Sequence, residues 1–205
     1  MANRRTIKRL TDLIPDVLIE AQRCDAITAR KALERAAEEL AYNYGFFTTT
    51  QTYSLEGAPA EERFMGTDCY VFYFDDAEVL GVEHIEALGD KETAPIYSFK
   101  VANEGKVYVA KQGIPLGADR LRMTCSILPS VDDDLSASTP LTRGRRVLLA
   151  LTLFDLFSMP GQLWSNSERA AYWRQMFLQN IETWSYNERF RKMTGGIILS
   201  NNPYA

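Results

Sequence analysis

The chain has 205 residues, of which 46% are hydrophobic and 24% are charged, and its formal net charge is −4 at pH 7. This balance is typical of a globular protein with a substantial core. The negative charge argues against a protein that wraps nucleic acid by bulk charge, because phosphate binding depends on clustered lysine and arginine. The one basic cluster, Arg4, Arg5, Lys8 and Arg9, is interpreted as an exposed terminal arm, with contact to nucleic acid or to an acidic partner surface as the alternative.

The sequence contains no apolar run of the roughly 18 residues that a membrane-spanning helix needs. The basic N-terminus also lacks the apolar segment of a secretory signal, so no membrane association is expected. Three cysteines, Cys24, Cys69 and Cys125, lie far apart without a CxxC pair. This spacing predicts reduced, buried thiols in a protein made in the cytoplasm.

The first part of the chain predicts helices over residues 10–44. Residues 10–21 form a candidate short helix, with Pro15 near its start, where proline is tolerated. Residues 25–44 carry apolar side chains at spacings of three and four, which predicts one longer helix with a single apolar stripe. Gly45 follows directly and is expected to end it.

The period changes between residues 46 and 128, where short alternating or apolar runs favour strands. An antiparallel sheet or small sandwich is expected, with Asn103–Gly105 as a tight turn. The candidate strands cover residues 47–53, 69–74, 79–88, 96–101, 106–110 and 121–127.

After a linker at 128–140, residues 147–157 form the most apolar segment, with Thr152 and Asp155 as its only polar residues. A helix apolar on nearly every side is expected to be buried in a bundle or between subunits. Met159-Pro160-Gly161 should end it. The next helix is expected to run to about Met193, with Ser165 and Glu168 forming a capping box at its start.

Together these elements predict an α+β fold, a helical bundle with an inserted antiparallel β region and an extended C-terminal tail. One domain is expected over residues 1–194, with helices at about 10–44 and 141–193 and the β region at about 46–128. Residues 195–205 are the C-terminal extension.

Motifs for catalysis are lacking in the sequence. The one histidine, His84, lies in a strand-like alternation and is interpreted as structural. The run Asp132-Asp133-Asp134 lacks the spacing, glycine and later glutamate of a calcium loop, and is interpreted as a solvated loop. No phosphate-binding glycine loop or nucleophile elbow is present. We therefore expect no enzyme, no catalytic residue, no metal site and no cofactor.

Residues 148–177 are the most distinctive part of the chain, with the structural motif Met159, Pro160, Gly161, Trp164, Tyr172 and Phe177. In order along the chain there are a buried helix, a Met-Pro-Gly break, a tryptophan soon after it, and a helix with an Ala-x-Tyr-like start. This segment resembles the head-to-tail connector proteins (adaptor or head-completion proteins) of tailed bacteriophages. The upstream elements come in the order expected for that family.

The resemblance implies a structural virion protein at the neck of the particle. Copies would form a ring, expected to be dodecameric, beneath the portal protein, and would extend the DNA channel. The implied partners are the portal, tail or nozzle proteins, further copies of the chain, and packaged DNA that passes without sequence-specific contact. The mild acidity suits a channel wall along which DNA slides.

The C-terminal extension places Ile197, Ile198 and Leu199 together. With Tyr204 they are the expected portal-binding residues, because exposed apolar segments often mark interaction sites; the alternative is that they fold back onto their own subunit. Two other functions stay open: a phage hydrolase that degrades peptidoglycan, and a non-viral interaction module.

Overall fold

The computed structural model describes residues 9–56, 60–73, 78–89, 93–101, 106–130, 132 and 141–194. Its contacts divide the chain into two compact units, one of Met1–Ala36 with Pro140–Ala205 and one of Ala37–Thr139. We call them the helical unit and the β unit. The expectation of a single domain over residues 1–194 stays a prediction.

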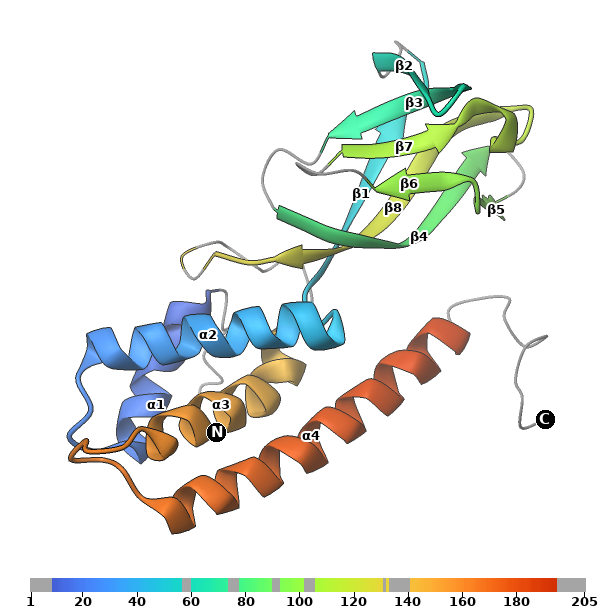
Figure 1. The fold of residues 1–205 in the computed structure, drawn as a ribbon. Coiled ribbons are helices and arrows are strands. Elements are labelled where there is room, and N and C mark those ends of the chain that lie inside the picture. The colour runs from blue at the N-terminus through green and yellow to red at the C-terminus, as the bar shows by residue number, and fades with distance from the viewer. Residues whose placement is uncertain are drawn as a thin grey trace. The chain divides into compact units, whose positions relative to one another are not determined.

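The helical unit contains two short N-terminal helices, most of a longer one, and a C-terminal helical hairpin (Figure 1). Asp25 begins the longer helix: Oδ1 accepts the Thr28 amide at 2.9 Å and Oδ2 accepts its hydroxyl at 2.7 Å. The Thr28 amide is the main reason that the pKa of Asp25 lies below its usual value. The helices are the 3₁₀ turn η1 (Leu10–Leu13), α1 (Ile14–Glu20), α2 (Ala26–Tyr44), α3 (Leu141–Ser158) and α4 (Ser167–Thr194).

The core of the helical unit joins residues from both ends of the sequence. Small side chains of α2 let the large ones of α3 approach closely, and burial of this apolar surface is the main stabilising contribution. Ion pairs between helices from the two ends of the sequence lie at the edge of this core. The buried core residues are Val17, Ala21, Ala29, Ala32, Leu153, Leu156, Phe157 and Ala170.

Three ion pairs link α1 and α2 to α3 and α4. Arg145 Nη2 lies 2.6 Å from Asp16 Oδ2. Arg169 Nη2 lies 2.9 Å from Glu20 Oε2, and its guanidinium also covers the Phe157 ring at 4.4 Å. The third pair joins Arg35 of α2 to Asp155 of α3 at 2.7 Å. Each pair spans more than a hundred residues of sequence, so the N-terminal helices are held against the C-terminal hairpin.

The β unit consists of two antiparallel four-stranded sheets. One sheet has the strand order β1-β8-β4-β5 and the other β2-β3-β7-β6. The strands are β1 (Thr48–Ser54), β2 (Ala60–Phe64), β3 (Thr67–Tyr73), β4 (Glu78–Gly89), β5 (Thr93–Pro95), β6 (Phe99–Val101), β7 (Lys106–Ala110) and β8 (Ala118–Leu128).

Strand β8 shows how sequence alternation builds the core of the β unit. Leu121, Met123 and Cys125 are fully buried, whereas Arg120 and Arg122, which alternate with them, are exposed. Burial raises the pKa of the Cys125 thiol to about 12, so the thiol stays protonated at neutral pH. In contact across the two sheets, the Tyr53 ring of β1 lies 5.0 Å from the Phe72 ring of β3.

The expected helical bundle with a small inserted β region is wrong. The described residues between 46 and 128 form eight strands in two sheets, and so make a substantial unit of their own. The expectation failed because strand pairing is non-local: residues of β1 pair with residues of β8 that are 66 to 78 positions away. The extended C-terminal tail and the Asn103–Gly105 turn lie outside the described residues.

Candidate functional site

The break between α3 and α4 is the feature on which the sequence interpretation depended. Met159 donates its amide to the Leu156 carbonyl at 3.2 Å, and Gly161 has a φ of +74°, a conformation that favours glycine. The Asn166 amide bonds the Phe157 carbonyl at 3.0 Å and so holds the loop against the end of α3. The expected helix stop is confirmed.

The start of α4 differs from the prediction. Asn166, and not Ser165, caps the helix: its side-chain Oδ1 accepts the Arg169 amide at 3.0 Å and its carbonyl accepts the Ala170 amide at 2.9 Å. The expected capping box with Glu168 is therefore wrong by one residue. Serine and asparagine both cap helices well, so their order in the sequence does not decide between them.

The inner face of α4 packs towards α3. Phe177 and Ile181 are buried, and Trp173 packs against the core of the helical unit. Trp164 from the loop also packs there, partly buried, and its indole nitrogen has no hydrogen-bond partner among the described residues. Tyr172 is 55% exposed and contacts the edge of Trp173. Tyr172 thus lies outside the core, as do the exposed Pro160 and Gly161 of the same motif, whereas Met159 and Trp164 pack against the core and Phe177 is buried.

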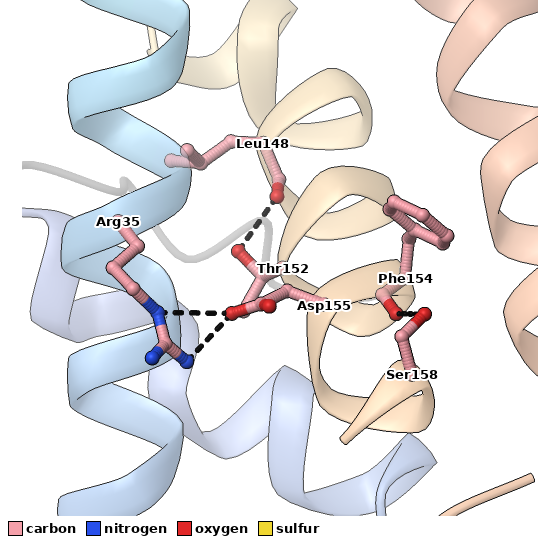
Figure 2. Close-up of polar contacts among 6 residues, drawn as sticks. All are labelled: Arg35, Leu148, Thr152, Phe154, Asp155 and Ser158. Carbon is pink, nitrogen blue, oxygen red and sulfur yellow. Dashed lines mark hydrogen bonds and ion pairs between the residues drawn. The ribbon is translucent and has the colours of Figure 1, made fainter. Parts of the chain in front are cut away.

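The polar side chains in and directly after the apolar stretch of α3 bond either the backbone of α3 or a side chain of α2 (Figure 2). Thr152 is fully buried, and its hydroxyl donates to the Leu148 carbonyl at 2.8 Å. The Ser158 hydroxyl likewise donates to the Phe154 carbonyl, at 2.7 Å. Asp155 accepts from both Nε and Nη2 of Arg35. These groups stabilise the helix and its neighbour.

An open hollow of about 690 Å³ lies on one side of the α3–α4 hairpin. We call it the hairpin groove. Its wall is mainly apolar, with serine hydroxyls, Gln175 and the exposed Arg174 also lining it. Leu178 lines it while remaining 53% exposed. The lining residues are Phe154, Phe157, Ser158, Pro160, Ser165, Ser167, Ala170, Ala171, Arg174, Gln175 and Leu178.

Sequence reasoning missed the groove residues of α4. Ala171, Arg174, Gln175 and Leu178 recur at spacings of three and four, which places them on one face of the helix, separate from the inner face. The second stripe was visible in the sequence, but the tryptophan face beside it is far more hydrophobic. An apolar, open groove with hydroxyl groups suits an extended or helical apolar peptide segment.

His84, in the β unit, lies on β4, half exposed, and its Nε2 is 3.0 Å from Glu86 Oε1. Glu86 Oε2 also contacts Arg122 of β8 at 3.3 Å. This small polar network joins two neighbouring strands at the surface. Among the described residues no group of three histidine, cysteine or acidic side chains is arranged to hold a metal ion.

The second sheet carries similar contacts between polar side chains. The Tyr108 hydroxyl donates to Glu62 Oε2 at 3.0 Å, and this bond is the main reason that the pKa of Tyr108 is raised. Lys111 Nζ lies 2.6 Å from Glu61 Oε2, and this contact raises the pKa of the lysine. Both contacts link the edge strand β2 to residues in β7 or directly after it.

Several predicted residues lie outside the described part of the chain. They include the expected portal-binding residues Ile197, Ile198, Leu199 and Tyr204, most of the basic arm and two of the three aspartates. No helix in the described residues is both long and apolar enough to cross a membrane. No protein-family model matches this chain, and no curated protein matches it in sequence.

Proposed function

We propose that this chain is a structural protein of the head-to-tail neck of a tailed bacteriophage. Copies assemble into a dodecameric ring beneath the portal, link the capsid to tail or nozzle proteins, and extend the channel through which DNA passes. The observation that carries the proposal is the hairpin groove, because the segment with the connector-like sequence forms both the hairpin and much of the groove wall.

A ring of identical subunits needs two different complementary surfaces on each copy. The hairpin groove is one candidate surface, since it is apolar and open. Other apolar side chains of the helical unit are also solvent-exposed, among them Ile19, Ile27 and Leu163. Exposed apolar side chains are found at protein interfaces, although single ones also occur on ordinary surfaces.

The remaining chemistry of the described residues supports a mechanical function. Near the hairpin, Thr152 and Ser158 bond backbone carbonyls of α3, and Asp155 and Arg169 form ion pairs within the unit. The net charge of −4 suits a channel wall, because a strongly basic wall would retain DNA by its phosphates.

The test is an assembly measurement on the purified full chain. Mass photometry and negative-stain microscopy of the protein mixed with the portal protein of the same phage should show a ring joined to the portal. A chain that stays monomeric and unbound would contradict the proposal. A parallel turbidity assay on peptidoglycan separates the hydrolase alternative, which alone predicts clearing.

A further inference from the structure

The hairpin groove offers an open, mainly apolar surface to an occupant. Phe154, Phe157, Pro160 and Leu178 contribute carbon surface to it, and the exposed part of Leu178 faces water in a single copy. Covering this surface would be favourable by about 25 cal/mol per Å² buried. Ser158 and Gln175 supply hydrogen-bonding groups beside the apolar wall.

The chain itself contains a segment with matching chemistry. Residues 195–205 carry no charged side chain, and Ile197, Ile198 and Leu199 are three consecutive aliphatic residues. In an extended segment successive side chains point to opposite sides, so two of the three can enter a groove together. Arg174 is the one charged residue that lines the groove, and its guanidinium can donate to backbone carbonyls.

The segment is too short to fill the groove of its own copy. Helix α4 is continuous from Ser167 to Thr194 (Figure 1), and its residues from Ala171 to Leu178 line the groove. At 1.5 Å per residue, Leu178 is about 24 Å and Ala171 about 35 Å from Thr194 along the helix axis. The chain from Thr194 to Leu199 reaches back about 17 Å, even when fully extended, so within one copy Leu199 comes no further than the Leu178 end of the groove.

We propose that the hairpin groove of one copy binds the Ile197–Leu199 segment of a second copy. This inference rests on the proposed ring function and names the contact between neighbouring subunits. Each copy has one groove and one segment, so the contact is heterologous and repeats around a ring until the ring closes. The segment then belongs to the subunit interface and not to the portal.

Cysteine cross-linking between two variants tests the contact directly. One full-length chain carries Leu178→Cys and the other Ile197→Cys, both in a Cys24→Ser background, because Cys24 is the partly exposed thiol of the native chain. Mild oxidation of the mixture should give a disulfide-linked pair about tenfold faster than the control mixture, because docking raises the local thiol concentration. In the control mixture, Tyr172→Cys takes the place of Leu178→Cys. Tyr172 lies on the same helix and is equally exposed, but it does not line the groove.

Equal rates in the two mixtures would overturn the proposal. So would a single chain carrying both Leu178→Cys and Ile197→Cys that forms its disulfide only within itself, since that result would show folding back.

A second measurement uses assembly and does not depend on thiols. Leu178→Glu and Ile197→Glu should each abolish ring formation, whereas Tyr172→Glu should leave it intact. Circular dichroism checks that all three variants fold. If Ile197→Glu forms rings but fails to bind portal, the segment is a portal anchor and the proposal is wrong.

The two proposals can fail separately. If the wild-type chain and the Leu178→Glu variant both form rings on the portal, the tail-to-groove contact is refuted and the neck function is kept. Cross-linking without any portal-bound ring would keep the contact and refute the neck function.

Discussion

The helical unit and the β unit are stabilised in different ways. The β unit is built from one continuous stretch of chain, and its strands are joined by backbone ladders such as the seven register pairs between β1 and β8. The helical unit brings together two stretches that flank the β unit, and in the described residues side-chain packing, ion pairs and hydrogen bonds donated by side chains hold them against each other. Its stability should therefore depend more strongly on individual side chains.

The largest effect is expected in the core of the helical unit. Leu153→Ala removes a fully buried side chain and should lower the free energy of unfolding by about 2–5 kcal/mol. All three tryptophans, at 164, 173 and 184, belong to the helical unit, so their fluorescence follows this unfolding. Met123 is equally buried in β8, so Met123→Ala is the matched change in the β unit. It should weaken the strand signal in infrared spectra and not the tryptophan signal. A Leu153→Ala loss below about 1 kcal/mol would show that the core adapts to the cavity.

A smaller effect is expected at Trp164. Trp164→Ala should cost about 2–3 kcal/mol, less than a fully buried aromatic residue, because Trp164 is only partly buried. Trp164→Phe is the control: it keeps an aromatic ring and removes an indole nitrogen that has no partner among the described residues. Chemical denaturation of both variants measures the difference, and equal losses would mean that ring packing is not what matters.

The ion pair between Arg169 and Glu20 should contribute less. A double-mutant cycle with Arg169→Met and Glu20→Gln should give a coupling of about 0.5–1 kcal/mol, because both side chains are partly exposed. The coupling should fall as salt is added, since ions screen surface charges. A coupling that is insensitive to salt would indicate that the Arg169 contact with the Phe157 ring dominates.

The smallest effect is expected for His84. His84→Gln keeps a hydrogen-bonding side chain beside Glu86 on an exposed strand face, and should change stability by less than about 0.5 kcal/mol. Ring assembly should be unaffected. Loss of assembly by a folded His84→Gln protein would point to a function for this residue that the proposed mechanical role lacks.

The sequence predicted most elements that rest on local patterns. The stripe in residues 25–44 predicted α2 closely, and Gly45, with a φ of +54°, ends it as expected. The apolar stretch at 147–157 is the buried part of α3, and Lys106–Ala110 is β7. In these segments the periodicity, the flanking glycine and the burial all favour the same structure.

Other features could not be predicted because their causes are non-local. Three of the five residues in Ala60–Phe64 are charged, yet this segment pairs with β3 as the edge strand β2. Thr93–Pro95 is too short to show a pattern and forms β5 against β4. The hairpin groove depends on the angle between α3 and α4, which the letters around Pro160 and Gly161 do not specify.

The length of α4 has a mechanical consequence. Its 28 residues form a rod of about 42 Å, whereas the 18 residues of α3, against which its inner face packs, span about 27 Å. A change of about 10° in the angle between the two helices would displace the far end of α4 by about 7 Å, given the helix rise. Small differences in how α4 packs on α3 therefore become large differences in where its C-terminal end can reach a neighbour.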